Sequence, residues 1–264
     1  MKKFLFVSVT LFASGAFAGI HIENVTRDIK TKAQQGSTQT MLVQNGMMRM
    51  NHGTGATIIK GTNFIMIDDK RKEYREMTKE DMKKMADQAG AAMKRMQEQM
   101  KNMKPEQRAM MEKMMGNKIP GGMGAAGGSD KPDVWEAKNL NKTGNVEGRT
   151  CTVWTMSRNG ALFEELCVVP FNSLPGKENL QKVFKDFAEA FKDLAKNNPN
   201  ADQTARAFAA IDGYPVRTRM YEADGKFRNS ETVLTKWVEE SIPASTFDVP
   251  AGYKKMVMPT MPPP

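Results

Sequence analysis

The sequence predicts an α+β protein: one curved antiparallel sheet, an open β-barrel, with helices on its concave face and a methionine-rich helical insert. Short segments with alternating apolar residues, separated by Gly and Asn, lie before residue 70 and after residue 134, a pattern typical of antiparallel strands. Two stretches with helical periodicity interrupt them, one rich in Met and one rich in Phe. No βαβ alternation with phosphate-binding glycines occurs, which argues against a nucleotide-binding fold.

The first 18 residues have the features of a secretory signal peptide. Lys2 and Lys3 form a positive n-region, residues 4–13 are apolar, and residues 16–18 (Ala-Phe-Ala) match the small-x-small cleavage pattern. The apolar run is too short to span a bilayer. We therefore expect cleavage after Ala18 and a periplasmic mature protein.

Residues 19–77 are the first expected β section. Alternation predicts strands at 20–25 and 38–43, and Asn45-Gly46 is a hairpin signal. Further short strands are expected at 47–50, 56–59 and 63–67. Tight turns between them indicate an antiparallel meander.

Residues 78–115 are expected to form the methionine-rich helical insert. Thr78 is the expected N-cap, with Asp81 three residues later. From Arg75 to Lys118 methionine is the only large apolar residue. The candidate ligand-binding face consists of Met82, Met85, Met93, Met96, Met100 and Met103, at steps that place them on one side of a helix. Pro105 fits the first turn of a second helix, and residues 116–133 form a Gly-rich linker.

A helix face composed only of methionine has three interpretations. It packs on the sheet as Leu would, since both residues form helices well. Alternatively, its flexible thioethers bind an apolar ligand or partner. In the third interpretation the same sulfur atoms bind Cu(I) or Ag(I).

Residues 134–254 are expected to continue the same domain as a β-hairpin, a helix and further strands. Cys151 and Cys167 flank the turn 158–160 (Arg-Asn-Gly), and a three-residue loop places them opposite each other within disulfide reach. An exported protein with two cysteines usually pairs them. A metal–thiolate site and a redox pair are the alternatives.

An amphipathic helix follows, with apolar residues at Leu180, Val183, Phe184, Phe187, Phe191 and Leu194. We expect its three phenylalanines to be buried against the sheet. A short helix near 201–210, a hairpin around Asp224-Gly225 and a last strand at 245–249 complete the section. Residues 255–264 are expected to form a flexible tail.

The sequence contains no motif of an enzyme or of a nucleic-acid-binding protein. His21 and His52 are the only histidines, and neither lies in a Ser-His-Asp, HExxH or Walker pattern. His52 is close to Met47, Met48 and Met50, so a mixed His/Met copper site is an alternative to an ordinary surface histidine. We assign no catalytic residue, no metal ligand and no cofactor, with Cu(I) entering only under the alternative. The net charge of +9 makes an anionic membrane surface a further candidate partner.

Three segments resemble a family of exported bacterial proteins of unknown function. They are 61–74 (Gly-Thr-Asn-Phe-Ile-Met-Ile-Asp-Asp-Lys-Arg-Lys-Glu-Tyr), 213–216 (Gly-Tyr-Pro-Val) and 243–254 (Pro-Ala-Ser-Thr-Phe-Asp-Val-Pro-Ala-Gly-Tyr-Lys). That family is similar to the lipoprotein-carrier (LolA/LolB-like) fold, an open β-barrel around an apolar cavity lidded by helices. The resemblance covers most of the chain after residue 18. The methionine-rich insert is not part of the carrier pattern, and the resemblance implies no functional residue.

The sequence therefore predicts a periplasmic, non-enzymatic binding protein for an apolar, lipid-like ligand or partner. A periplasmic Cu(I)/Ag(I)-binding protein that uses the methionine-rich helices is one alternative. An envelope chaperone that uses the same face on unfolded chains is the other.

Overall fold

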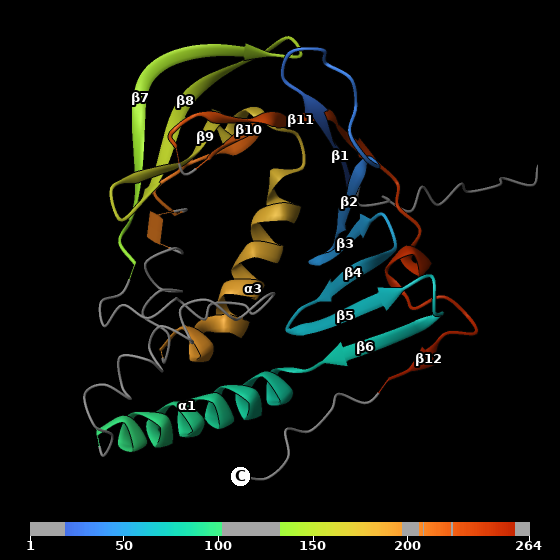
Figure 1. The fold of residues 1–264 in the computed structure, drawn as a ribbon. Helices are drawn as coiled ribbons and strands as arrows, with labels where there is room; N and C mark the ends of the chain where they lie inside the picture. The colour runs from blue at the N-terminus through green and yellow to red at the C-terminus, as the bar shows by residue number, and fades with distance from the viewer. Residues whose placement is uncertain (1–18, 102–132, 197–205, 208, 223, 257–264) are drawn as a thin grey trace, which may run out of the picture.

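Twelve strands form one sheet that curves around a central helix in the computed structural model (Figure 1). The structure describes residues 19–101, 133–196, 206–207, 209–222 and 224–256. The strand order is β12-β6-β5-β4-β3-β2-β1-β11-β10-β9-β8-β7. The strand pairs are antiparallel except for β12 and β6, which run parallel. The predicted curved antiparallel sheet of an α+β protein is therefore present.

The strands are β1 (Gly19–Asp28), β2 (Gln39–Gln44), β3 (Met47–His52), β4 (Gly55–Lys60), β5 (Asn63–Asp68), β6 (Glu73–Met77), β7 (Trp135–Val146), β8 (Arg149–Arg158), β9 (Ala161–Val169), β10 (Tyr214–Tyr221), β11 (Phe227–Glu240) and β12 (Lys254–Lys255). Among the described residues the named helices are α1 (Lys79–Lys101) and α3 (Lys177–Lys196), with two 3-10 turns, η1 (Phe171–Ser173) and η2 (Ala244–Phe247).

Strands β1 to β5 match the strands expected from alternation. Asn45 and Gly46 form the expected two-residue turn between β2 and β3, with positive φ angles of 53° and 75°. Strand β6 was not predicted, because Glu73, Arg75 and Glu76 make it look like a polar loop. The segment is a strand because its backbone pairs with β5 on one side and with the short β12 on the other.

Two apolar cores lie on opposite faces of strands β1 to β6. The concave core contains Ile20, Val43, Met48, Ile59 and Phe64, and α3 packs on it. The convex core contains Ala56, Ile58, Ile65, Ile67, Ile242 and Phe247. The segment after β11 covers this convex side, and Phe247 is fully buried there. The strand expected at 245–249 is wrong: the chain forms η2 instead, which turns Phe247 into the core.

Cys151 and Cys167 form the predicted disulfide, with 5.4 Å between their Cα atoms. The register predicted for their hairpin is wrong. Asn159 and Gly160 form a two-residue turn that pairs Arg158 with Ala161, and a bulge at the next pair shifts the register. Cys167 therefore lies opposite Val153, and the bridge runs diagonally between β8 and β9.

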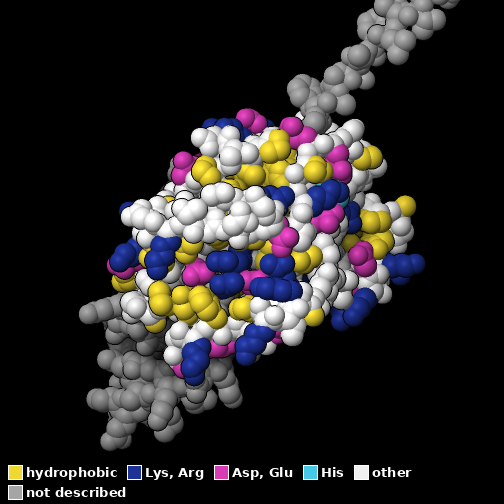
Figure 2. All heavy atoms as spheres, turned by 90° about the horizontal axis from the view of Figure 1, so that it is seen from above, with side chains coloured by type: hydrophobic (Ala, Val, Ile, Leu, Met, Phe, Trp, Pro, Cys, Tyr) yellow, Lys and Arg dark blue, Asp and Glu magenta, His cyan; other side chains and the backbone are white. Residues whose placement is uncertain are grey.

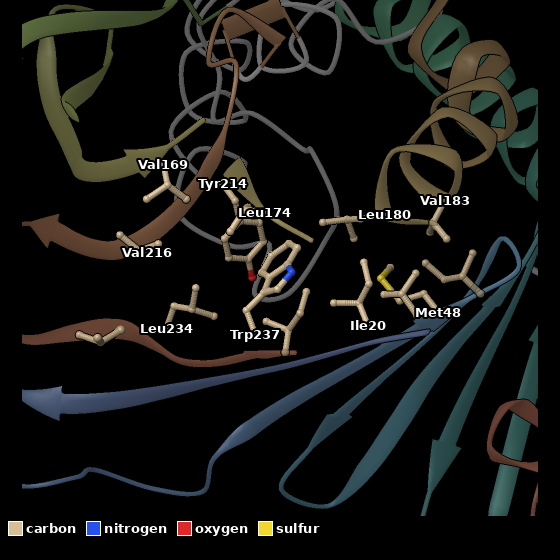
Figure 3. Close-up of a cluster of buried hydrophobic side chains, with 14 of the residues drawn as sticks. Ile20, Met48, Val169, Leu174, Leu180, Val183, Tyr214, Val216, Leu234 and Trp237 are labelled. Atoms are coloured by element: carbon tan, nitrogen blue, oxygen red, sulfur yellow. The ribbon is translucent and has the colours of Figure 1, made fainter. Parts of the chain in front are cut away.

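In the part of α3 whose side chains the structure describes, the buried face is narrower than the sequence suggested. Leu180 and Val183 are fully buried against the sheet, and Figure 3 shows both in the same apolar cluster as Ile20 and Met48. Phe184 is 44% exposed, so the prediction that it is buried is wrong. One residue corresponds to about 100° of rotation on a helix, which takes Phe184 past the contact made by Val183. The side chains of Phe187 and Phe191 lie outside the described residues.

Helix α1 follows β6 directly and contacts α3. Thr78 and Asp81 cap it reciprocally: the Asp81 amide donates to Thr78 Oγ1 at 3.2 Å, and the Thr78 amide donates to Asp81 Oδ2 at 3.0 Å. Met82 then enters the concave core, which fixes the first turn of the helix. The expected second helix from Pro105 lies outside the described residues, as does most of the helix expected at 201–210.

Candidate functional site

Methionine is concentrated on the concave face of the sheet. Strands β2 to β6 contain six methionines, at positions 41, 47, 48, 50, 66 and 77. The strand pairings place five of them on the face that carries α3, while Met47 joins the convex core. The opposite face of the same strands is built mainly from Ile, Leu and Ala. We call the five residues Met41, Met48, Met50, Met66 and Met77 the concave methionine face.

The part of this face nearest α3 is closed. Register pairs join Ile20, Val43, Met48, Ile59, Phe64 and Met77 into one row across β1 to β6. All six side chains are buried, and they belong to the core that includes Leu180, Val183 and Met82. This row packs the helices onto the sheet and leaves no surface for a ligand among the described residues.

The next row, two residues further along each strand, is progressively more open. It consists of Ile22, Met41, Met50, Thr57, Met66 and Arg75. Ile22 is fully buried, Met41 and Met50 are half-buried, and Met66 is 39% exposed. The row therefore presents flexible apolar side chains to the space inside the curve of the sheet.

The methionines predicted to bind a ligand on α1 have different surroundings. Met82 is only 2% exposed and belongs to the core, so its role is packing. Met85 is 45% exposed. The backbone of Met93, Met96 and Met100 lies in α1, but their side chains, and all of Met103, lie outside the described residues.

Sequence reasoning did not select Met41, Met50 and Met66 as binding residues. Alternation shows that Met48 and Met50 share a face, but it does not show whether that face is concave. Met41 joins them only through the β2–β3 register. A search for methionine at period two on neighbouring predicted strands would have found the pattern.

The two histidines lie on opposite faces. His21 sits on the convex side, where its Nδ1 is 2.7 Å from Glu240 Oε1 and its Nε2 is 3.0 Å from Glu23 Oε1. His52 ends β3 on the concave side, and its Nε2 is 3.2 Å from Thr57 Oγ1. Among the residues the structure describes, no three His, Cys, Asp or Glu side chains gather as a metal site.

A cluster of charges holds the tip of the β7–β8 hairpin against β1. The Glu231 carboxylate lies 2.9 Å from both Arg27 Nε and Lys32 Nζ, and 2.8 Å from Arg219 Nη2. Arg27 also pairs with Glu147 in the hairpin turn at 2.6 Å. Burial alone would raise the pKa of Glu231, but the hydrogen bonds from Lys32, Arg27 and Arg219 outweigh it and lower the pKa to about 2.

Side chains of both charge signs are exposed on the face seen in Figure 2. Figure 2 looks at the molecule from above Figure 1 and shows basic and acidic side chains interleaved across that face. The view contains no broad patch of basic side chains of the kind that would attract an anionic surface. In the described part of the chain, no helix is long and apolar enough to span a membrane.

No protein-family model matches the chain, and no curated protein matches it. Solved structures that are similar include an uncharacterized conserved protein from Thermus thermophilus, with 6% identity and a TM-score of 0.42, covering 91% of this chain and 90% of that one. MucB in complex with MucA(peri) is similar with 11% identity and a TM-score of 0.31, covering 92% and 58%. A LolA superfamily protein from Nitrosomonas europaea follows with 8% identity and a TM-score of 0.27, covering 88% and 89%. A LolA superfamily protein is among these similar structures, and the three likenesses concern the course of the chain alone.

Proposed function

We propose that the protein is an exported, non-enzymatic binding protein that holds an apolar, lipid-like ligand or an apolar segment of a partner on its concave methionine face. One observation supports this most directly: five of the six methionines on β2 to β6 share the concave side, where their burial decreases away from α3. Met48 and Met77 pack in the closed row, so the ligand contacts of this proposal come from the more open Met41, Met50 and Met66, whose flexible side chains suit an adaptable apolar surface.

Methionine suits a surface that must accept ligands of irregular shape. Its unbranched side chain adapts at little cost, and each buried methylene of a ligand contributes about 0.8 kcal/mol. Met66 and the half-buried Met41 and Met50 provide contacts on three strands. In this proposal the remaining methionines of the predicted ligand-binding set, from Met85 to Met103, supply further apolar contacts to the ligand.

Export fits the covalent structure of the chain. A buried disulfide persists in an oxidising compartment and is rare in the cytosol. The signal peptide over residues 1–18 and cleavage after Ala18 belong to the same proposal, with the periplasm as the compartment. N-terminal sequencing of the secreted protein tests the cleavage position.

The first test compares two exposed apolar residues on opposite faces of the sheet. Met66 is 39% exposed on the concave side, and Val238 is 37% exposed on the convex side. We expect Met66→Gln to weaken binding of a fluorescent fatty acid by roughly fivefold, or about 1 kcal/mol. The polar amide of Gln replaces the apolar end of the Met side chain that would contact the ligand. Val238→Gln is the matched control and should leave affinity unchanged. Equal effects of both changes, or no binding by the wild type, would contradict the proposal.

The second test separates the possible roles of the methionines from Met93 to Met103. Replacing Met93, Met96, Met100 and Met103 together by Leu keeps size and helix propensity but removes the sulfur atoms. Fatty-acid affinity should survive if these residues supply apolar contacts. Loss of Cu(I) binding in this variant, without fatty-acid binding by either protein, would favour the copper-binding alternative. Suppression of aggregation of an unfolded client, with neither ligand bound, would favour the chaperone alternative.

A further inference from the structure

The end of strand β3 brings two methionines and a histidine together on the concave face. Met50 and His52 are two residues apart on one strand, so their side chains share a face. Met47, which is also close to His52 in sequence, belongs to the convex core and is excluded. Met41 takes its place, because the β2–β3 register sets it directly opposite Met50.

The register also fixes how closely these three residues approach. Gln44 and Met47 flank the two-residue turn as a hydrogen-bonded pair, so Met41 and Met50, three pairs further on, form a non-hydrogen-bonded pair. Cα atoms of such a pair lie about 4.5 Å apart. Residues two apart on a strand are separated by about 7 Å. Diagonal neighbours such as His52 and Met41 lie at about 7–8 Å, within reach of long side chains.

His52 is held in an orientation that leaves one ring nitrogen free. Its Nε2 is 3.2 Å from Thr57 Oγ1, and Thr57 lies opposite Met50 on β4. When Nε2–H donates to this hydroxyl, Nδ1 carries the lone pair. Histidines that bind metals commonly have their second ring nitrogen fixed by a hydrogen bond in this way.

The donor set selects a soft ion. Two thioethers and one imidazole carry no formal charge, whereas Zn²⁺ and Ca²⁺ sites are built from thiolates, carboxylates and several imidazoles or carbonyls. Thioether sulfur prefers Cu(I) and similar ions. The cation of Arg49, next to Met50, points away, because its Nη1 donates to the Thr246 carbonyl at 3.0 Å. Both cysteines of the chain are in the disulfide, so no thiolate competes.

From this geometry we propose that Met41, Met50 and His52 form a binding site for a soft monovalent metal ion, Cu(I) or Ag(I). His52 is exposed and the two methionines are half-buried, so an ion reaches the site from solvent. The site is distinct from the methionines of α1. It shares Met41 and Met50 with the concave methionine face, so a bound ion and an apolar ligand compete for these side chains.

The test uses Ag(I), which needs no reductant and leaves the disulfide oxidised. The mature protein, with its methionine methyl groups labelled with ¹³C, is titrated with silver nitrate in chloride-free buffer while affinity is followed by calorimetry. We expect the Met41 and Met50 methyl resonances to shift with one equivalent of Ag(I). Met50→Leu and His52→Ala should each lower affinity by at least about tenfold, since loss of even a supporting partner of a ligand costs that much.

Matched variants make the outcome decisive. Met47→Leu changes the same strand on the opposite face and should bind Ag(I) like the wild type. The quadruple Leu variant of α1 should also retain the site. Undiminished affinity in Met50→Leu and His52→Ala, or loss confined to the α1 variant, would overturn the proposal. Thermal unfolding of each variant excludes a folding defect, and failure of fatty-acid binding would leave this metal test unaffected.

Discussion

At the scale of single residues, Glu231 shows how a buried charge can stabilise the fold. Its side chain is 1% exposed, and it accepts hydrogen bonds from Arg27, Lys32 and Arg219. Removing one member of such a cluster leaves the others without compensation. The cluster joins β1, the loop after β1, β10 and β11, so its loss would loosen the centre of the sheet.

We expect Glu231→Gln to lower the free energy of unfolding at pH 7 by about 3 kcal/mol, from the difference between an ordinary carboxyl pKa and the folded value. The folded pKa of about 2 lies below the ordinary carboxyl value of 4.5. Stability from this group is therefore fully present above pH 4.5 and is lost as the pH falls toward 2. Urea unfolding of wild type and variant at several pH values measures this, and the gap should narrow in acid.

The control is Glu222→Gln, which removes an exposed ion pair with Arg228. Such pairs contribute little, so the change should stay within about 0.5 kcal/mol. A Glu231→Gln defect of equal size at pH 7 and pH 3 would show that it does not arise from ionisation.

At the scale of elements, Leu180 and Val183 hold α3 against the sheet, whereas Phe184 is largely exposed. We expect Leu180→Ala to lower the free energy of unfolding by about 2–5 kcal/mol, because the side chain is fully buried and leaves a cavity. Phe184→Ala should cost less than about 1 kcal/mol, because the ring is 44% exposed. Chemical denaturation of both variants gives the comparison. A larger loss for Phe184→Ala would reverse the assigned orientation of the helix.

The disulfide between β8 and β9 packs closely against a glycine in the neighbouring strand β7. A Cβ at Gly144 of β7 would lie 2.6 Å from Cys167 Sγ and 3.4 Å from Cys151 Sγ. We expect Gly144→Ala to cost about 1–3 kcal/mol, because the bridge has little room to move. In a background with Cys151→Ala and Cys167→Ala, the same change should cost less. Equal costs in both backgrounds, measured by thermal unfolding, would place the strain elsewhere.

At the scale of the whole molecule, local pattern predicted most strands, the helices α1 and α3, and the disulfide. Alternation and turn residues act over a few positions, and β1 to β5 follow them. Strand β6 and the bulge that shifts Cys167 opposite Val153 were missed, because both depend on pairing partners. The concave methionine face was missed for the same reason. Arg27 and Glu231 are 204 residues apart, and no local signal connects them.

The position of β1 in the sheet also determines when the sheet can be completed. β1 starts at Gly19, yet its neighbour β11 is Phe227–Glu240, so the two strands at the middle of the sheet come from the beginning and near the end of the chain. Pairings of such long range form slowly, since the entropy of closing a large loop opposes them. A growing chain consequently keeps β1 without its β11 partner until almost all of it has been synthesised. In the exported protein that we propose, this delay would keep the chain loose enough to pass through a translocation channel and would leave the final folding step to the compartment beyond the membrane.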